Sequence, residues 1–252
     1  MIDYFHIPPE ALIDVQITKK QFGEKVVLSG LEKRALREDV QRVTMKALLQ
    51  TRTIGVASYK DEEYDYTQII FAEVSIRNQS KAALIASMIQ KAFPAPLFLI
   101  VNYEDYYCVN WCVKRINQLD NSKRVIEDEQ TTRFFDINGE EELVNHWLQS
   151  LNLEKASYST LKDLYEYMAS KLLMLKVSDE AGNFIQADTN TLVDYSAILH
   201  LLQENRKEQQ SIIGEIKAET QFNKTIKLNS NLRELQYKER NLQKRLIKEY
   251  KN

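Results

Sequence analysis

The distribution of proline constrains this chain more than any other feature of its sequence. All four prolines lie before residue 97. Proline removes an amide donor and clashes with the preceding helical turn, so its absence from the rest of the chain permits long helices. Near the C-terminus, leucines recur at intervals of 4, 3, 7 and 4 residues, which is the a/d spacing of heptad repeats. They are Leu228, Leu232, Leu235, Leu242 and Leu246.

These leucines predict a helical, coiled-coil-like region over residues 190–252, in which they form an interface. Asn205 and Gln209 interrupt the apolar stripe upstream of them. Two long helices that break near residues 222–230 fit this pattern, and so does one extended helix. The interface is then internal, against a helical partner, or between two copies of the chain in a homo-oligomer. The residues that extend the apolar stripe upstream are Ile198, Leu202, Ile212 and Ile216.

The first 178 residues predict an α+β domain in which helices flank a mixed sheet. Runs of β-branched and aromatic residues predict strands over residues 52–59, 67–77, 97–102 and 106–114. Apolar residues at helical spacing predict helices over residues 28–50, 80–93, 140–149 and 160–175. Residues 177–188 predict a polar, hairpin-like connector. The predicted fold class is therefore α+β, followed by a long helical C-terminal region.

Charge is divided unevenly along the chain. The net charge is -2 overall, but residues 201–252 hold 12 basic and 7 acidic side chains. The tail therefore carries +5 and the first 200 residues carry -7, which excludes a uniformly basic nucleic-acid coat protein. A basic helix can bind DNA phosphates by releasing counterions, and it can equally be the solvated face of a helical pair. The candidate DNA-binding residues are Lys238, Arg240, Lys244, Arg245 and Lys248.

Cysteine and histidine form no recognisable catalytic or metal-binding pattern. Cys108 and Cys112 fall in a predicted strand, where four residues separate their side chains by roughly 13 Å. That distance is too long for a disulfide or a shared metal ion, and no second pair completes a zinc site. We therefore expect two reduced core thiols and no metal site. His6, His146 and His200 are far apart in the sequence, glycine-rich phosphate-binding motifs are absent, and no cofactor is expected.

One strand allows an enzymatic alternative. The run IIFAEVSIRN alternates with a period of two and places Glu73 and Arg77 on the same face. Restriction-type nucleases hold Mg²⁺ with an acid on one strand and an acid-x-Lys motif on the next, and the metal activates water. Here the motif is degenerate, because Ser75 stands at the position of the acid. Asp65, Glu73 and Arg77 are weak candidate catalytic residues, and Mg²⁺ is a cofactor only under this alternative.

Five segments resemble successive parts of one bacterial family, and together they cover nearly the whole chain. They are LSGLEKRALREDVQRVTMKALL, FAEVSIR, KAFPAPLFLIVNY, LKDLYEYMASKLL and AETQFNKTIKLNSNLRELQYKERNLQKRL. The family is the domain-of-unknown-function family numbered 4391. Its members are typically encoded beside helicases and DNA methyltransferases, in restriction-modification and phage-defence neighbourhoods. The resemblance thus implies a role by association and assigns no chemistry.

These observations lead to one main functional hypothesis and two alternatives. The main hypothesis is an accessory, non-catalytic subunit of a bacterial restriction-modification or anti-phage defence assembly. Such a subunit would dock a helicase or DNA methyltransferase partner and also contact DNA. The alternatives are a metal-dependent nuclease, degenerate or active, and a homodimeric adaptor without DNA contact. Because no secretory signal and no membrane-length apolar run is visible, we expect a cytoplasmic protein without membrane contact.

Overall fold

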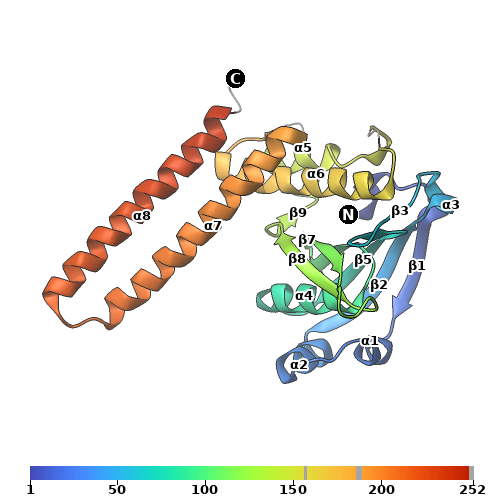
Figure 1. The fold of residues 1–252 in the computed structure, drawn as a ribbon, viewed down its shortest axis with the longest axis horizontal. Helices are drawn as coiled ribbons and strands as arrows, with labels where there is room; N and C mark the ends of the chain where they lie inside the picture. The colour runs from blue at the N-terminus through green and yellow to red at the C-terminus, as the bar shows by residue number, and fades with distance from the viewer. Residues whose placement is uncertain (156–157, 186–188, 250–252) are drawn as a thin grey trace. The chain divides into compact units, whose positions relative to one another are not determined.

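The computed structural model describes residues 1–155, 158–185 and 189–249, which fold into two compact units. The first unit, Met1–Leu172, contains a β-sheet with helices packed on it. The second unit, Leu173–Asn252, contains a long helical hairpin (Figure 1). Among the described residues, no helix combines the length and the apolar character that crossing a bilayer requires.

A seven-stranded mixed sheet forms the centre of the first unit. Its strands are β1 (Leu12–Ile17), β2 (Val40–Leu49), β5 (Ile69–Ile76), β6 (Leu97–Tyr103), β7 (Tyr106–Ile116), β8 (Arg124–Thr131) and β9 (Phe135–Asp136). Their order is β1-β2-β5-β6-β7-β8, with β9 also paired to β7. β5 and β6 are parallel because helix α4 (Ala82–Ala92) crosses between them, and the other pairs are antiparallel. The predicted mixed sheet with flanking helices is therefore confirmed.

Shorter elements and the remaining helices complete the fold. β3 (Tyr59–Lys60) and β4 (Asp65–Tyr66) form a separate two-stranded sheet. The remaining α-helices are α1 (Lys19–Lys25), α2 (Gly30–Glu38), α3 (Thr51–Ile54), α5 (Glu142–Gln149), α6 (Leu161–Ala181), α7 (Thr189–Ala218) and α8 (Phe222–Glu249). Single turns of 3-10 helix, η1 to η4, lie at Ile2–Phe5, Pro9–Ala11, Gln79–Lys81 and Leu153–Lys155.

The alternation of side chains along β5 decides which face of the sheet holds the main core. The even-numbered residues from Ile70 to Ile76 pack in one apolar cluster with α4, as the period-two pattern predicted. Phe71 lies on the opposite face, where its ring packs against Phe5 and Phe98 with centroid distances of 5.1 Å in each pair. The sheet is therefore apolar on both faces at β5.

The predicted helix over residues 28–50 is wrong in its second half, because α2 ends at Glu38 and β2 begins at Val40. Val40 and Val43 both lie in the α4-side cluster despite their odd spacing. A β-bulge between Val40 and Arg42 adds one residue to β2 and shifts its alternation. The bulge thus gives a strand the three-residue spacing that normally indicates a helix.

Two further predictions need correction, and two edge strands were not predicted. The strand expected over residues 52–59 is wrong, because α3 forms there and Gly55 ends it in the left-handed region with φ of 70°. The connector expected over residues 177–188 begins as helix, because α6 continues to Ala181 and ends at Gly182 with φ of 74°. Residues 186–188 lie outside the described residues. The edge strands β1 and β8 were not predicted, because they bury few side chains and so lack a clear apolar alternation.

The C-terminal region forms two antiparallel helices that contact each other (Figure 1). α7 and α8 contain 30 and 28 residues, which corresponds to lengths of about 45 and 42 Å. The two-helix alternative is therefore confirmed, with the break at residues 219–221, slightly before its predicted position. Leu242 and Leu246 are buried, and Leu228, Leu232 and Leu235 are half-buried. The supercoil expected from the heptad spacing stays a prediction.

The polar residues that interrupt the apolar stripe of α7 form a connected layer inside the hairpin. Arg206 donates hydrogen bonds of 2.6 Å to Glu239 of α8 and to Glu180 of α6. Gln209 donates to Glu239 and to Asn205 at 2.7 Å. The Nδ2 group of Asn205 is buried without a partner among the described residues, but the bonds of Arg206 and Gln209 form in one alignment only. We therefore infer that these bonds select the register of α7 against α8.

We expect substitutions along α8 to separate its buried side from its exposed side. Leu242 is 6% exposed, so Leu242→Glu should place a charge in the helical contact and cost roughly 3–5 kcal/mol. Leu235→Glu should cost less, because Leu235 is half-buried. Denaturant unfolding of the full chain, followed by its helical circular dichroism, measures both. Tyr237→Glu is the matched control, since Tyr237 is 62% exposed, and an equal loss in all three variants would contradict the hairpin contact.

Candidate functional site

Strand β7 lies at the centre of the most complete candidate site of the first unit. One of its faces contacts α4, and the other faces α6. Asn110 and Cys112 point toward α4, where both contact the side chain of Gln90, at 2.8 and 3.2 Å. Trp111 and Val113 point to the opposite face, toward α6. One face of β7 therefore anchors α4, and the other face is available to line a cavity.

Lys114 holds the C-terminal end of α4 against the sheet. Its ammonium group is buried and donates to the backbone carbonyls of Gln90, Phe93 and Ala95 at 2.9, 2.6 and 3.0 Å. Carbonyls at the end of a helix lack intrahelical partners and carry the negative end of the helix dipole, so a cation stabilises them. Burial lowers the pKa of Lys114 to about 8. The role of Lys114 is therefore structural.

A β-bulge interrupts the pairing of β8 with β7. Trp111 pairs with Gln130 and Val113 with Glu127, so β8 has one more residue than β7 between these pairs. Asp128, in the bulge, adopts a left-handed conformation with φ of 45°. Cys112 has no partner in the register of β6 or of β8. The amide and carbonyl groups of Cys112 therefore need hydrogen-bond partners from outside the sheet.

Tyr165 of α6 forms hydrogen bonds with both peptide groups of Cys112. Its hydroxyl donates to the carbonyl oxygen of Cys112 at 2.7 Å and accepts from the Cys112 amide at 3.3 Å. Its ring stacks on Phe98 with centroids 4.4 Å apart and approaches Tyr66 at 5.5 Å. Complete burial raises the pKa of Tyr165, so the hydroxyl stays protonated. This contact fixes the distance between α6 and the sheet.

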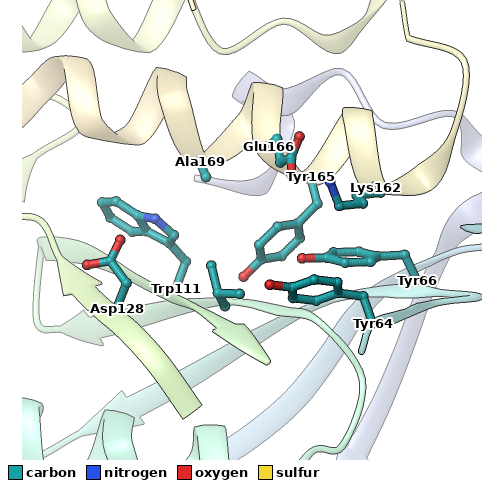
Figure 2. Close-up of a pocket in the computed structure, with 9 residues that line it drawn as sticks. Tyr64, Tyr66, Trp111, Asp128, Lys162, Tyr165, Glu166 and Ala169 are labelled. Atoms are coloured by element: carbon teal, nitrogen blue, oxygen red, sulfur yellow. Dashed lines mark ion pairs between the residues drawn. The ribbon is translucent and has the colours of Figure 1, made fainter. Parts of the chain in front are cut away.

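The space between α6 and the sheet is a cavity of about 240 Å³. Figure 2 shows Trp111 and Asp128 on one side of it and Tyr64, Tyr66 and Tyr165 on the other, with α6 above. The residues that line it are Tyr64, Tyr66, Trp111, Val113, Asp128, Lys162, Tyr165, Glu166 and Ala169. We call this cavity the aromatic pocket. Its walls are mostly aromatic, and its charged groups lie at the rim.

Two polar groups in the aromatic pocket have no hydrogen-bond partner among the described residues. Tyr66 is 2% exposed and Trp111 is 4% exposed, and no bond is formed by the Tyr66 hydroxyl or the Trp111 indole N–H. Neither atom is fully enclosed, so both remain accessible from the cavity. Burial raises the pKa of Tyr66 well above its usual value, so its hydroxyl is protonated at neutral pH. Buried Tyr and Trp usually find a polar partner, which makes these groups ready to bind one.

The charged residues of the rim are already partly paired. Lys162 contacts Glu166 at 2.7 Å and lies over the rings of Tyr59 and Tyr64, 5.5 and 5.9 Å from their centroids. Its contact with Glu166 raises the pKa of Lys162. Asp128 is exposed and accepts one hydrogen bond from Gln130 at 2.6 Å. With Lys162 and Glu166 neutralising each other, the rim keeps the negative charge of Asp128.

The candidate nuclease residues do not share this pocket and lie apart from one another. Asp65 and Arg77 lie beyond opposite ends of β5, whose eight residues span about 26 Å. Asp65 binds Lys60 and Arg124, and Arg77 donates to the backbone carbonyl of Glu38. Glu73 lies within the strand, paired with Thr44 and Ile100. In the described part of the chain, no three carboxylate, thiol or imidazole groups are placed to hold a metal ion.

The basic residues of α8 lie on its solvent side. Lys238, Arg240, Lys244 and Arg245 are exposed, and none of the four has an ion-pair partner in the part of the chain that is described. The side chain of Lys248 lies outside the described residues. Glu239, the acidic residue between them, turns inward to Arg206. The outer face of α8 is therefore strongly basic.

Comparison with known proteins assigns a family. The family model described as "Domain of unknown function (DUF4391)" matches residues 5–238. The chain belongs to this family. No curated protein and no solved structure matches this DUF4391 protein. The matched region includes the sheet, the aromatic pocket and most of the hairpin, so the family model spans both compact units.

Sequence reasoning missed the aromatic pocket in this DUF4391 protein. Trp111 was visible only as part of the CVNWC run, and Asp128 belongs to a strand that the sequence did not predict. A usable signal was present in the tyrosines, because Tyr64 and Tyr66 alternate in the acidic run before β5. That spacing places both rings on the same side of an extended chain.

We expect Tyr165→Phe to destabilise the first unit by roughly 1–3 kcal/mol, because it leaves the buried amide and carbonyl of Cys112 unpaired. Denaturant unfolding of the full chain measures the change. Tyr167→Phe is the matched control on the same helix, because the Tyr167 hydroxyl donates no hydrogen bond to the described residues. Equal stability of the two variants would contradict the anchoring role of Tyr165.

We also expect both cysteines to resist thiol reagents until the protein unfolds. Cys108 and Cys112 are each 1% exposed and unpaired, and burial raises the pKa of both thiols to about 12. Because the folded pKa is raised, the thiols contribute stability below about pH 8.5 that is lost as the pH rises toward 12. A disulfide reagent at pH 8 should label both residues in denaturant and neither in buffer. Rapid labelling in buffer would show that the thiols are accessible.

Proposed function

We propose that this DUF4391 protein is an accessory, non-catalytic subunit of a bacterial restriction-modification or anti-phage defence assembly. Its C-terminal helices contact DNA and dock a helicase or DNA methyltransferase partner. The observation that supports this proposal best is the outer face of α8, where four basic side chains are exposed without ion-pair partners among the described residues.

The arrangement of α8 supports a phosphate contact in particular. Its heptad leucines and Glu239 face α7, so these side chains lie inside the hairpin and the four basic side chains lie on the outer face. Arg233, Arg240 and Lys244 recur at intervals of seven and four residues and so share one stripe of the outer face. Unpaired Lys and Arg along one face release counterions when they meet a phosphate backbone.

Exposed apolar residues on the same hairpin support a protein partner. Phe222 and Ile226, in the first turns of α8, are 77% and 53% exposed, and Tyr237 is 62% exposed. Apolar and aromatic side chains of this kind are enriched in protein interfaces. A partner that covers the start of α8 would leave the basic residues nearer its C-terminal end free for DNA.

We expect combined replacement of Lys238, Arg240, Lys244 and Arg245 by Gln to weaken DNA binding without regard to sequence. Each lost phosphate contact should reduce the slope of log K against log salt by about 0.9. Duplex titrations at several salt concentrations measure this slope. The matched control replaces four exposed basic residues of the first unit, Lys20, Lys33, Arg42 and Lys81, and so changes the net charge equally.

Two results would contradict the proposal. The first is the absence of DNA binding by the unmodified chain at low salt. The second is equal binding by the α8 variant and its control. Docking is tested separately, by co-purification of the full chain with the products of its neighbouring genes, using Phe222→Ser and Ile226→Ser to weaken the contact.

A further inference from the structure

The aromatic pocket has the features of a ligand site that the proposed function does not use. It lies wholly within the first unit, between α6 and the strands β7 and β8. Its volume of about 240 Å³ is somewhat below the ~300 Å³ at which sites for complete small-molecule ligands begin. The pocket therefore suits one ring system or one side chain, with the rest of the ligand outside.

The unpartnered groups restrict the chemistry of that ligand. The indole N–H of Trp111 can only donate, so the ligand must carry a hydrogen-bond acceptor. An alkylammonium or guanidinium group has none, although the aromatic walls would otherwise suit a cation. The Tyr66 hydroxyl can donate or accept, and Figure 2 shows it directed to the interior of the pocket.

The rim adds a second restriction. The carboxylate of Asp128 lies beside the indole of Trp111 in Figure 2 and accepts hydrogen bonds. It therefore favours an amino group on the ligand and disfavours an anion such as a free phosphate. The side-by-side rings of Tyr66 and Tyr165, with centroids 5.5 Å apart, favour a flat ligand that can contact aromatic surfaces.

A planar ring that carries both an amino donor and an adjacent acceptor meets all of these conditions. We propose that the aromatic pocket binds a single nucleobase with an exocyclic amino group, which contacts Tyr66, Trp111 and Asp128. Carboxylates recognise the amino group of cytosine in this way, and aromatic side chains accept unstacked bases. The base comes either from a free nucleoside or nucleotide, or from single-stranded nucleic acid whose backbone stays outside the pocket.

Calorimetric titration of the full chain tests this assignment. The probes are adenosine, cytidine, thymidine and short single-stranded oligonucleotides of deoxyadenylate and deoxythymidylate. Adenosine or cytidine should bind at least tenfold more tightly than thymidine, which lacks the amino group. Equal affinity for nucleoside and oligonucleotide indicates the free ligand as the source, and tight binding of deoxyadenylate oligonucleotide alone indicates the strand. No binding of any probe at millimolar concentration, or equal binding of thymidine, overturns the proposal.

Three variants connect the binding to the pocket. Tyr66→Phe and Trp111→Phe each remove one unpartnered polar group and keep an aromatic ring, so each should weaken binding roughly five- to tenfold. Asp128→Asn should reduce the preference for amino-bearing bases, and asparagine tolerates the left-handed backbone at this position. Tyr107→Phe on β7, outside the pocket, is the matched control. Unchanged affinity in all three pocket variants overturns the assignment.

The outcome is separable from that of the DNA proposal. Free nucleosides carry no phosphate, so the basic residues of α8 should not affect their binding. The α8 variant with four Gln replacements should therefore bind adenosine with the same affinity as the unmodified chain. Loss of duplex binding in that variant with intact nucleoside binding supports both proposals. Loss of nucleoside binding in it would overturn the placement of the base in the aromatic pocket.

Discussion

The contact between Tyr165 and the backbone of Cys112 is the interaction on which the candidate site depends. Cys112 has no partner in the register of β6 or of β8, and an unpaired buried peptide group costs about 1–3 kcal/mol. One hydroxyl satisfies both the amide and the carbonyl. The same contact draws α6 onto the sheet, and the bulge carries Asp128 to the rim. The pocket therefore depends on two features, the anchoring of α6 by Tyr165 and the bulge in β8 that holds Asp128.

The opposite face of β7 is held by Lys114, and the two faces differ in how completely their polar groups are paired. Lys114 meets three carbonyls, and Gln90 meets Asn110 and Cys112, so the polar groups that meet α4 there are paired. On the α6 face, the Tyr66 hydroxyl and the Trp111 indole have no partner among the described residues. A buried polar network that is fully paired stabilises a structure, whereas unpaired groups beside a cavity are available to a ligand. The fully paired face therefore holds α4, and the unpaired groups on the other face are the basis of the proposed ligand site.

The hairpin of the second unit follows a similar rule. Its leucines supply apolar contact that many alignments of two helices could use, but the bonds from Arg206 to Glu180 and Glu239 form in one alignment. The polar layer also removes Glu239 from the surface of α8. The bond between Arg206 and Glu239 therefore helps to select the register of the hairpin and removes one negative charge from the outside of α8.

Elements with local, periodic signals could be predicted from the amino-acid sequence. Heptad leucines and the absence of proline specified the long helices, and period-two alternation specified β5 and its two faces. The other features depend on how the strands pair, because a β-bulge changes the spacing of side chains according to the neighbouring strand. A bulge in β2 gave the strand the three-residue spacing typical of a helix. A second bulge, in β8, places Asp128 at the rim of the aromatic pocket. Tyr66, Trp111 and Asp128 come together through strand pairing and the docking of α6, and no pattern in any one segment contains that information.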